Sequence, residues 1–264
     1  MKSSTEKLGI TIAQISDCHL FSDVNGLHHG ANVYNNLLST LRSIRENTAI
    51  ESVFFTGDLT QDHSEASYQH FVAAIKQEKI KVPVYYLAGN HDEVSLLNKY
   101  LVGEPFTADK TFNAKQWQVQ LLQSKSDTPA GIVKEENIDT LIHATEPEKH
   151  QLLMMHHHPV DVGYFIDKHG LLNKEIFWSK TKDIPKLAAI ACGHVHRASK
   201  LSKGIINLKS SSIDQSVDVY TCPATSIQFD PQALTVKALD KGPGYRLFYL
   251  GSNGTLTSKA IWCE

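Results

Sequence analysis

The chain has 264 residues, of which 26 are Lys or Arg and 28 are Asp or Glu, so its formal net charge is −2. This near balance excludes the strongly cationic surface with which proteins bind nucleic acid non-specifically. Apolar residues make up 41% and charged residues 20% of the chain, proportions that are typical of a globular protein and exclude a disordered one.

Strand and helix patterns alternate through the first half of the chain. Apolar runs rich in β-branched residues predict strands at 8–16, 50–56, 82–88, 152–155 and 186–192. The last two runs are short enough that a buried helix is an alternative. Helical spacing predicts one helix over 33–45 and another after Ser64, a candidate N-cap.

The second half changes character. Between residues 103 and 150 the pattern is weakest, with a strand predicted at WQVQLL and a short helix at 138–145 that ends near Pro147. From residue 204 onward the alternation predicts antiparallel strands, including ATSIQF and ALTVKALD, with a tight turn at Asn253-Gly254. We expect one domain over residues 1–264, with a core at 8–200 and the strands of a second sheet at 201–264.

Cysteines and apolar runs indicate where the protein works. No apolar run reaches the roughly 18 residues that a membrane-spanning helix needs, and the N-terminus lacks the apolar core of an export signal. The four cysteines lie far apart, and a chain of this length needs no disulfide framework. We therefore expect reduced thiols, with Cys18 and Cys192 buried and inert, and a cytoplasmic location.

Histidine is the unusual component, with 14 residues. Several lie in clusters with Asp, Asn and Gly, and each cluster or single carboxylate follows a predicted strand: Asp17-Cys18-His19, Gly57-Asp58, Gly89-Asn90-His91-Asp92, His156-His157-His158 and Gly193-His194-Val195-His196. Because ligands bind at the carboxyl ends of strands in open α/β sheets, we expect the five clusters to converge on one site.

The donor types in these clusters indicate metal binding. In an extended segment, residues i and i+2 point to the same side, so Asp17 and His19 could bind one cation together, as could His194 and His196. With Asp58, Asn90 and His157 the set reaches two carboxylates, one amide and four imidazoles, which suits two ions that share a carboxylate. Mixed N and O donors without thiolate favour Mn, Fe, Zn or Co.

Two such ions, roughly 3.5–4 Å apart, would form a clamp for phosphoryl transfer. They would acidify a shared water to hydroxide and absorb the developing negative charge. His91 lies beside Asn90 and could protonate the leaving group, a contribution of about 10²–10⁴-fold.

The motifs, taken in order, resemble the signature of the calcineurin-like metallophosphoesterases. This signature is D-x-H, GD, GNHD, H-x-P and GHxH, and it spans residues 10 to 197 here. Within that superfamily, SDCHLF, GDLTQD, MHHHPV, CGHVHR and ATSIQF are most similar to bacterial class III 3',5'-cyclic AMP phosphodiesterases, which extends the likeness to about residue 229.

The resemblance implies an α/β fold, a four-layer α-β-β-α sandwich with two stacked mixed β-sheets. It implies two metal ions per chain, Fe or Mn or both, with Zn allowed by the ligand types. One ion would bind Asp17, His19, Asp58 and His196, and the other Asp58, Asn90, His157 and His194. The family ligand lies two residues before the proline, which selects His157. His91 would be the general acid, a metal-bridging hydroxide would attack, and Asn90, His91 and His196 would contact the phosphate.

Some residues depart from the family pattern, and for several histidines a structural role or no functional role is the simpler interpretation. Many relatives carry Asp where this chain has Gln61, so either Asp62 or Asp92 could orient His91. His156 is expected to pack in the core or to donate a hydrogen bond to a ligand, and His158 could be structural or line the rim of the substrate site. Seven other histidines are expected to be surface residues without a role: His28, His29, His63, His70, His143, His150 and His169.

We therefore expect a two-metal phosphodiesterase that converts 3',5'-cyclic nucleotides, above all cyclic AMP, to 5'-nucleotides. Its partner would be that small molecule, with no nucleic acid and no membrane. The alternatives are another substrate (a nucleotide pyrophosphate, a phospholipid intermediate or a nuclease target) and a non-catalytic scaffold of the same fold. A nuclease would need a basic track, which the net charge does not suggest. A scaffold is disfavoured because no ligand is missing and His91 is present.

Overall fold

The computed structural model describes residues 9–207 and 212–264. Its first sheet has six strands in the order β14-β13-β1-β4-β5-β6. The strands are β1 (Gly9–Ile15), β4 (Ile50–Phe55), β5 (Val84–Tyr86), β6 (Phe106–Thr107), β13 (Gly244–Gly251) and β14 (Leu256–Trp262). The four that come first along the chain run parallel, and β13 and β14 add an antiparallel edge.

The second sheet also has six strands, in the order β11-β12-β10-β9-β8-β7. They are β7 (Thr111–Asn113), β8 (Trp117–Leu121), β9 (His150–Met155), β10 (Leu187–Cys192), β11 (Ser199–Asn207) and β12 (Ser212–Thr221). Its four central strands are parallel, and the outer two are antiparallel to their neighbours. A small hairpin of β2 (Leu27–His28) and β3 (Ala31–Asn32) stands apart from both sheets.

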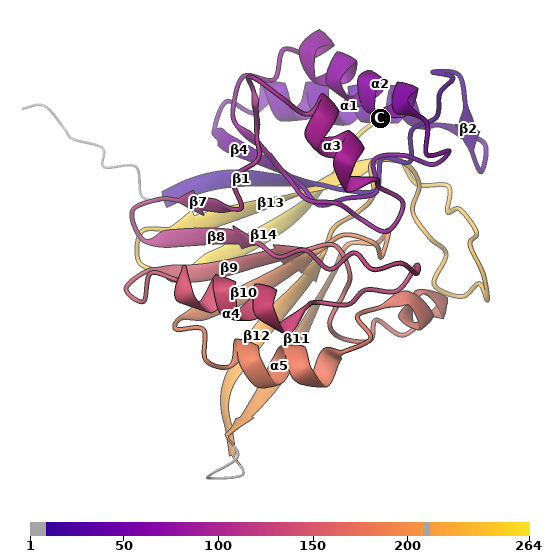
Figure 1. Cartoon of the computed structure of the whole chain (residues 1–264). Helices are drawn as coiled ribbons and strands as arrows, with labels where there is room; N and C mark the ends of the chain where they lie inside the picture. The colour runs from indigo at the N-terminus through magenta and orange to yellow at the C-terminus, as the bar shows by residue number, and fades with distance from the viewer. Residues whose placement is uncertain (1–8, 208–211) are drawn as a thin grey trace, which may run out of the picture.

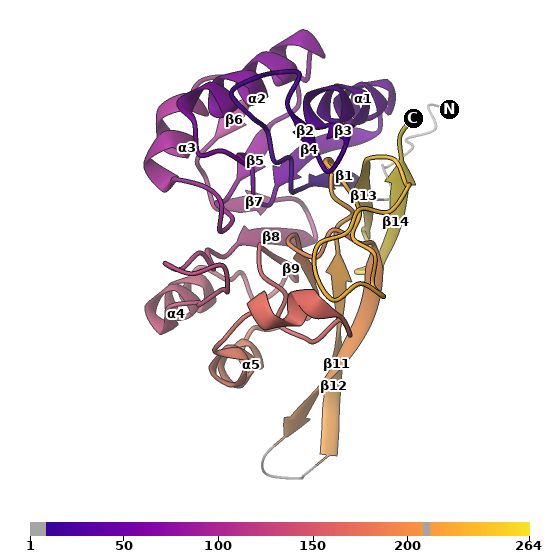
Figure 2. The same ribbon diagram turned by 90° about the vertical axis from the view of Figure 1, so that its right-hand side faces the viewer.

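Helices cover the outer faces of both sheets, which gives four layers (Figure 1, Figure 2). On the first sheet lie α1 (Val33–Glu46), α2 (Glu65–Gln77) and α3 (Val94–Tyr100), and on the second lie α4 (Glu135–His143) and α5 (Lys174–Thr181). A one-turn 3-10 helix, η1 (Phe165–His169), follows β9. A third apolar cluster joins the inner faces of the two sheets. It includes Ile12 and Phe54 of the first sheet and Val119 and Met154 of the second. The predicted α-β-β-α sandwich is confirmed.

The periodicity located most elements to within a few residues. The five strands predicted from apolar runs between residues 8 and 192 are present as β1, β4, β5, β9 and β10. The two short runs at 152–155 and 186–192 are therefore strands and not helices. The N-cap prediction is confirmed, because the Ser64 hydroxyl accepts a hydrogen bond from Ser67 N at 3.2 Å. The predicted turn is present, with Gly254 in the left-handed region at φ 84°.

The end of the chain departs from expectation. Only β11 and β12 extend the second sheet, whereas β13 and β14 pair beside β1 in the first, so residues 201–264 do not form a sheet of their own. The runs predicted as strands around SIQF and ALTVKALD form a loop with one isolated bridge, Phe229 to Ala238. Residues 208–211, part of the predicted run GIINLKSSS, lie outside the described residues.

Two further expectations concern the membrane and the thiols. Among the described residues, no helix combines the length and the apolar character needed to cross a bilayer. All four cysteines are buried free thiols, and burial raises the pKa of both Cys18 and Cys192. A raised pKa keeps a thiol protonated and unreactive, in agreement with an inert role.

Candidate metal centre

The five predicted clusters lie together at the carboxyl ends of the parallel strands. Asp17 and His19 follow β1, Asp58 follows β4 and the histidine triplet follows β9. Backbone hydrogen bonds tie the loops to one another, from Asp17 N to Gly57 O at 2.9 Å and from His19 N to Asp58 O at 3.1 Å. Groups of His and Asp donors from these loops are close enough to hold a metal ion. The convergence expected from strand positions is therefore present.

The backbone of these loops is not extended, contrary to the sequence argument. Five site residues have left-handed backbones, with φ of 59° at Asp17, 48° at His19, 58° at Asp58, 66° at His194 and 51° at His196. Such a conformation costs an L-residue roughly 1–2 kcal/mol. The side chains converge because each loop turns sharply at its ligand, and not because neighbouring residues alternate along a strand. Unfavourable conformations of this kind persist where the surrounding structure enforces a functional geometry.

One half of the cluster consists of Asp17, His19 and His196. The Nε2 atoms of His19 and His196 lie 3.1 Å apart, and His196 Nε2 lies 3.4 Å from an Asp17 carboxylate oxygen. Asp17, in turn, accepts the backbone N–H of His194 with both oxygens, at 3.1 and 3.0 Å. The side chains of this half and of His194 are all buried, so the donors face one another with little access to solvent.

The other half is centred on His156. Its Nε2 lies 3.1 Å from the Asn90 amide oxygen and 3.3 Å from Asp58 Oδ2. The same Asp58 oxygen lies 3.7 Å from His19 Nε2, so this carboxylate stands between the two halves. His194 packs against His156 with ring centroids 5.0 Å apart. The position of Asp58 is the one that a bridging ligand would need.

Hydrogen bonds on the far side of each ring fix which nitrogen faces the cluster. The Nδ1 atoms of His19, His156 and His196 lie 2.8, 2.7 and 2.8 Å from acceptor oxygens of Gln61, Thr56 and Ile227. An acceptor at Nδ1 requires the proton there and leaves the Nε2 lone pair pointing into the cluster. With all three rings neutral, their lone pairs and the two carboxylates directed at one space would repel one another, and cations between them would relieve that repulsion.

The residues therefore fit a pair of metal ions. His194 Nε2 is buried and has no hydrogen-bond partner within the described part of the chain, which is costly for a neutral ring and expected for a ligand atom. Burial lowers the pKa of His19 and of His194 well below the usual value, so both rings are neutral and able to coordinate. At His156, burial acts in the same direction, but the charge and hydrogen bond of Asp58, the Asp17 charge and the Thr56 carbonyl together outweigh it and raise the pKa to about 9. A cation at this position would displace that proton.

The histidine triplet is arranged differently from the prediction that selected His157. Although His157 lies in one possible donor group with His156 and His194, both of its ring nitrogens already have partners. Nδ1 lies 2.9 Å from Ser124 Oγ, and Nε2 lies 3.2 Å from the Pro129 carbonyl oxygen, which can only accept. The geometry thus favours His156 as the ligand.

Strand alternation explains this difference. Met154 belongs to the apolar cluster between the sheets, and Met155 belongs to the cluster beneath α4 and α5. With a period of two, His156 continues the face of Met154, toward Asp58 and Thr56, and His157 continues the face of Met155. Counting back from the proline ignored this parity.

His91, the predicted general acid, lies beside the cluster. Its backbone N–H donates to Asp58 Oδ1 at 2.9 Å, and its ring meets the ring of His19 edge-on at 4.9 Å. Neither Asp92 nor Asp62, the two residues considered from the sequence, orients the His91 ring. Asp92 accepts the backbone N–H groups of Asp58, Leu59 and Gly89.

Asp62 accepts from Ser22 N and from the N–H and hydroxyl of Ser64, so it too is turned away from His91. Nδ1 of His91 is buried without a partner among the described residues. The chain fixes His91 instead through its main chain, since His63 Nδ1 lies 3.0 Å from His91 O and the two rings are parallel at 5.8 Å.

Sequence reasoning missed several contributors. Gln61 replaces the expected Asp and binds His19, and Phe229 stacks on His196 with ring centroids 3.9 Å apart at 4°. His28 and His63, interpreted as surface residues without a role, stack on His19 and His91. Position next to a ligand motif was the only available signal for His63, and His28 offered none, because it comes from the β2–β3 hairpin.

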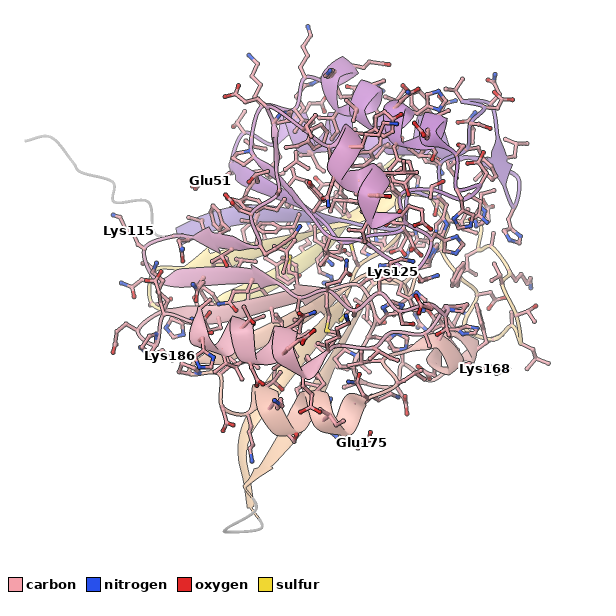
Figure 3. The ribbon with its side chains drawn as sticks, viewed as in Figure 1. Glu51, Lys115, Lys125, Lys168, Glu175 and Lys186 are labelled. Carbon is pink, nitrogen blue, oxygen red and sulfur yellow. The ribbon has the colours of Figure 1, made fainter. Side chains whose placement is uncertain are left out.

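A cavity of about 360 Å³ opens over the cluster. Its floor contains His19, Asp58, Asn90, His91, His194 and His196. The remaining walls come from η1 and from the loop after Phe229. Lys125, labelled in Figure 3, donates to Asn90 O at 3.1 Å. A volume of this size suits a small molecule.

Comparison with known proteins agrees with this geometry. Residues 10–198 match the family described as calcineurin-like phosphoesterase. A protein of Colwellia psychrerythraea named probable cyclic nucleotide phosphodiesterase is 56% identical over 96% of this chain and 94% of its own length. The 3',5'-cyclic adenosine monophosphate phosphodiesterase CpdA of Escherichia coli is 31% identical over 95% of this chain and 88% of its own length.

Solved structures share the fold at low sequence identity. A dimetal phosphatase of Danio rerio superimposes with a TM-score of 0.63 at 13% identity, covering 97% of this chain and 99% of that one. A purple acid phosphatase of yellow lupin gives the same TM-score at 14% identity, covering 96% of this chain and 53% of that one. At such identities, the likeness concerns the fold alone.

Proposed function

The chain belongs to the calcineurin-like phosphoesterase family, and on that premise we propose that this metal-dependent enzyme hydrolyses 3',5'-cyclic nucleotides. The observation that carries the proposal is the Asp58-centred donor cluster on the floor of a small-molecule cavity, with His91 beside it. The names of the two relatives support the substrate class, and cyclic AMP, with 5'-AMP as product, is our first choice.

The proposed ligands follow the geometry. Asp17, His19, Asp58 and His196 would hold one ion, and Asp58, Asn90, His156 and His194 the other. When bound, the ions supply a hydroxide nucleophile at neutral pH and neutralise phosphate charge. Fe and Mn are our first choice and Zn is compatible, since the donors are N and O and both nearby cysteines are buried outside the cluster.

The chain's own residues would bind the substrate and move the proton. The phosphate would lie on the floor of the cavity against Asn90, His91 and His196. Burial lowers the pKa of His91, although the Asp58 charge opposes this, so the ring is mostly neutral in the free protein at pH 7. An anionic diester next to the ring would raise that pKa again, and His91 could then hold the proton that the ribose 3' oxygen needs as it leaves.

The side chains of the site favour a catalytic site for a mononucleotide over a nuclease or a non-catalytic scaffold. A nuclease would need a track of cations along its substrate, whereas Lys168 is the one lysine or arginine among the residues that line the described cavity. A scaffold that has lost catalysis would have no reason to keep every donor and the acid in place.

A panel of phosphodiesters tests the proposal. Protein reconstituted with Mn²⁺ should hydrolyse cyclic AMP faster than a nucleotide pyrophosphate, a phospholipid diester or a single-stranded oligonucleotide, and chromatography should identify 5'-AMP. Preferential hydrolysis of one of the other substrates, or formation of 3'-AMP, would contradict the proposal.

A further inference from the structure

The cavity has a wall with a chemistry unlike that of its floor. Beyond the donor cluster it is lined by Phe165 and Ile166 of η1 and by Phe229, Leu234 and Val236. The last three belong to the loop of residues 229–238, which we name the rim loop. Figure 3 labels Lys168 on η1, and Figure 1 shows this one-turn helix beside the yellow rim loop at the right-hand edge of the molecule.

The rim loop is an ordered element with a defined shape. Phe229 pairs with Ala238 in an antiparallel bridge, and Asp230 N donates to Lys237 O at 2.8 Å. The side chains of Asp230 and Lys237 form an ion pair at 3.1 Å. These contacts close the base of the loop and present Leu234 at its tip.

Leu234 is exposed although it lies over the cavity. Its side chain is 87% accessible to solvent, the highest value among the large apolar residues of the described chain. An exposed leucine gains free energy when an apolar partner covers it. Its position on the cavity wall means that a molecule bound below would be that partner.

The apolar wall begins directly at the metal centre. The Phe229 ring lies parallel to the ring of His196 with centroids 3.9 Å apart, and Phe165 packs against Phe229 at 5.4 Å. A diester with its phosphate on the donor cluster would therefore place its next rigid group against these side chains. In a cyclic nucleotide that group is the ribose with its base.

The wall offers few groups that could read the edge of a base. Apart from the floor residues and Pro129, its polar members are Lys168, His169 and Thr235, with no carboxylate or amide side chain. Recognition of a base edge needs donors and acceptors placed opposite it, whereas stacking and apolar contact accept any base.

We propose that the rim loop and η1 form a nucleobase subsite that binds the flat face of a base by apolar contact and does not read its edge. This inference rests on the proposed function, because it assumes a nucleotide with its phosphate on the donor cluster. Cyclic AMP and cyclic GMP should then have kcat/KM values within about tenfold of each other. Removal of the base should weaken binding far more than its exchange.

The test compares Leu234→Asn with Val102→Asn, a control at a 63%-exposed apolar residue after α3. The substrates are cyclic AMP and 1-deoxyribose 3,5-cyclic phosphate, which lacks a base. Leu234→Asn should raise KM for cyclic AMP about tenfold relative to KM for the base-free analogue. Val102→Asn should leave this KM ratio at the wild-type value. An equal effect of Leu234→Asn on both substrates, or no effect, would overturn the subsite.

Calorimetry separates failure of the subsite from failure of the proposed function. The wild-type holoprotein should bind 5'-AMP about tenfold more tightly than ribose 5-phosphate, and Leu234→Asn should remove that preference. Equal affinities in the wild type would overturn the subsite even if cyclic AMP is hydrolysed. A clear preference for 5'-AMP without turnover of any cyclic nucleotide would support the subsite and refute the proposed function.

Discussion

The assignment of His156 as the triplet ligand can be tested with a matched pair of variants, His156→Asn and His157→Asn. An asparagine side chain reproduces the Nδ1 position of histidine and removes Nε2. In His156→Asn the amide can still donate to Thr56 O, while the nitrogen that faces Asp58 and Asn90 is lost. In His157→Asn the oxygen can still accept from Ser124, while the hydrogen bond to Pro129 O is lost.

The structure sets different magnitudes for the two losses. Removal of an outer partner of a metal ligand typically costs 10–100-fold in affinity, so removal of the ligand atom itself should cost at least about 100-fold at one of the two sites. His157→Asn should change metal affinity less than tenfold. It should instead lower the free energy of unfolding by about 1–2 kcal/mol, because the partly buried Pro129 carbonyl loses its donor.

Metal titration by calorimetry and urea denaturation of the metal-free protein measure the two effects separately. We predict that His156→Asn holds one ion tightly and the other weakly, and that His157→Asn holds both. The reverse pattern, with metal lost from His157→Asn and kept in His156→Asn, would refute the reasoning from strand parity.

Three further groups of variants test other parts of the site. Asp58→Asn should lose both ions, and two tightly bound ions in this variant would contradict the bridging role. His91→Ala should keep both ions while its turnover falls about 10²–10⁴-fold, and full activity in this variant would contradict the role of His91 as the acid. Burial lowers the pKa of His156, but Asp58, Asp17 and the Thr56 carbonyl together raise it to about 9, so a proton is displaced when a cation binds at pH 7. Metal affinity should therefore rise with pH up to about 9. Binding enthalpies measured in buffers of different ionisation enthalpy should show that a proton is released, and fewer protons should be released by His156→Asn. Enthalpies that do not depend on the buffer would contradict this proton release. Burial alone would raise the pKa of Asp62, but hydrogen bonds from Ser22 and Ser64 lower it to about 2. The charged carboxylate therefore stabilises the folded state above about pH 4, and this stabilisation is lost as the pH falls toward 2. Asp62→Ala should cost about 1 kcal/mol at pH 7, as befits an exposed side chain, and nothing near pH 2; an equal cost at both would show that the charge is irrelevant.

The sequence was most informative where a local pattern has one structural solution. Apolar runs bounded by polar clusters located β1, β4 and β5 of the first sheet and β9 and β10 of the second, but not β6 or β7. The rule that strand ends gather ligands led us to expect Asp17, Asp58 and His194 in one site. Alternation also points to His156, the ligand that we propose, within the triplet, since Met154 and Met155 face opposite layers.

Other features depend on contacts between distant segments, which no local pattern reports. The stacking of Phe229 on His196 requires the last third of the chain to return over the site. The loop around Leu234 alternates like a strand, but over residues 9–207 and 212–264 its pairing is limited to the isolated bridge from Phe229 to Ala238, so it remains a loop. The left-handed backbone of the ligand residues is imposed by the surrounding structure against the preference of each residue.

Anomalous diffraction from crystals of the Mn²⁺-reconstituted protein tests the central claim most directly. We predict two strong peaks, one on each side of the Asp58 carboxylate, the first within coordination distance of His19 and His196 and the second of His156 and His194. A single peak, or peaks at any other group of side chains, would contradict a two-metal centre built from these five loops.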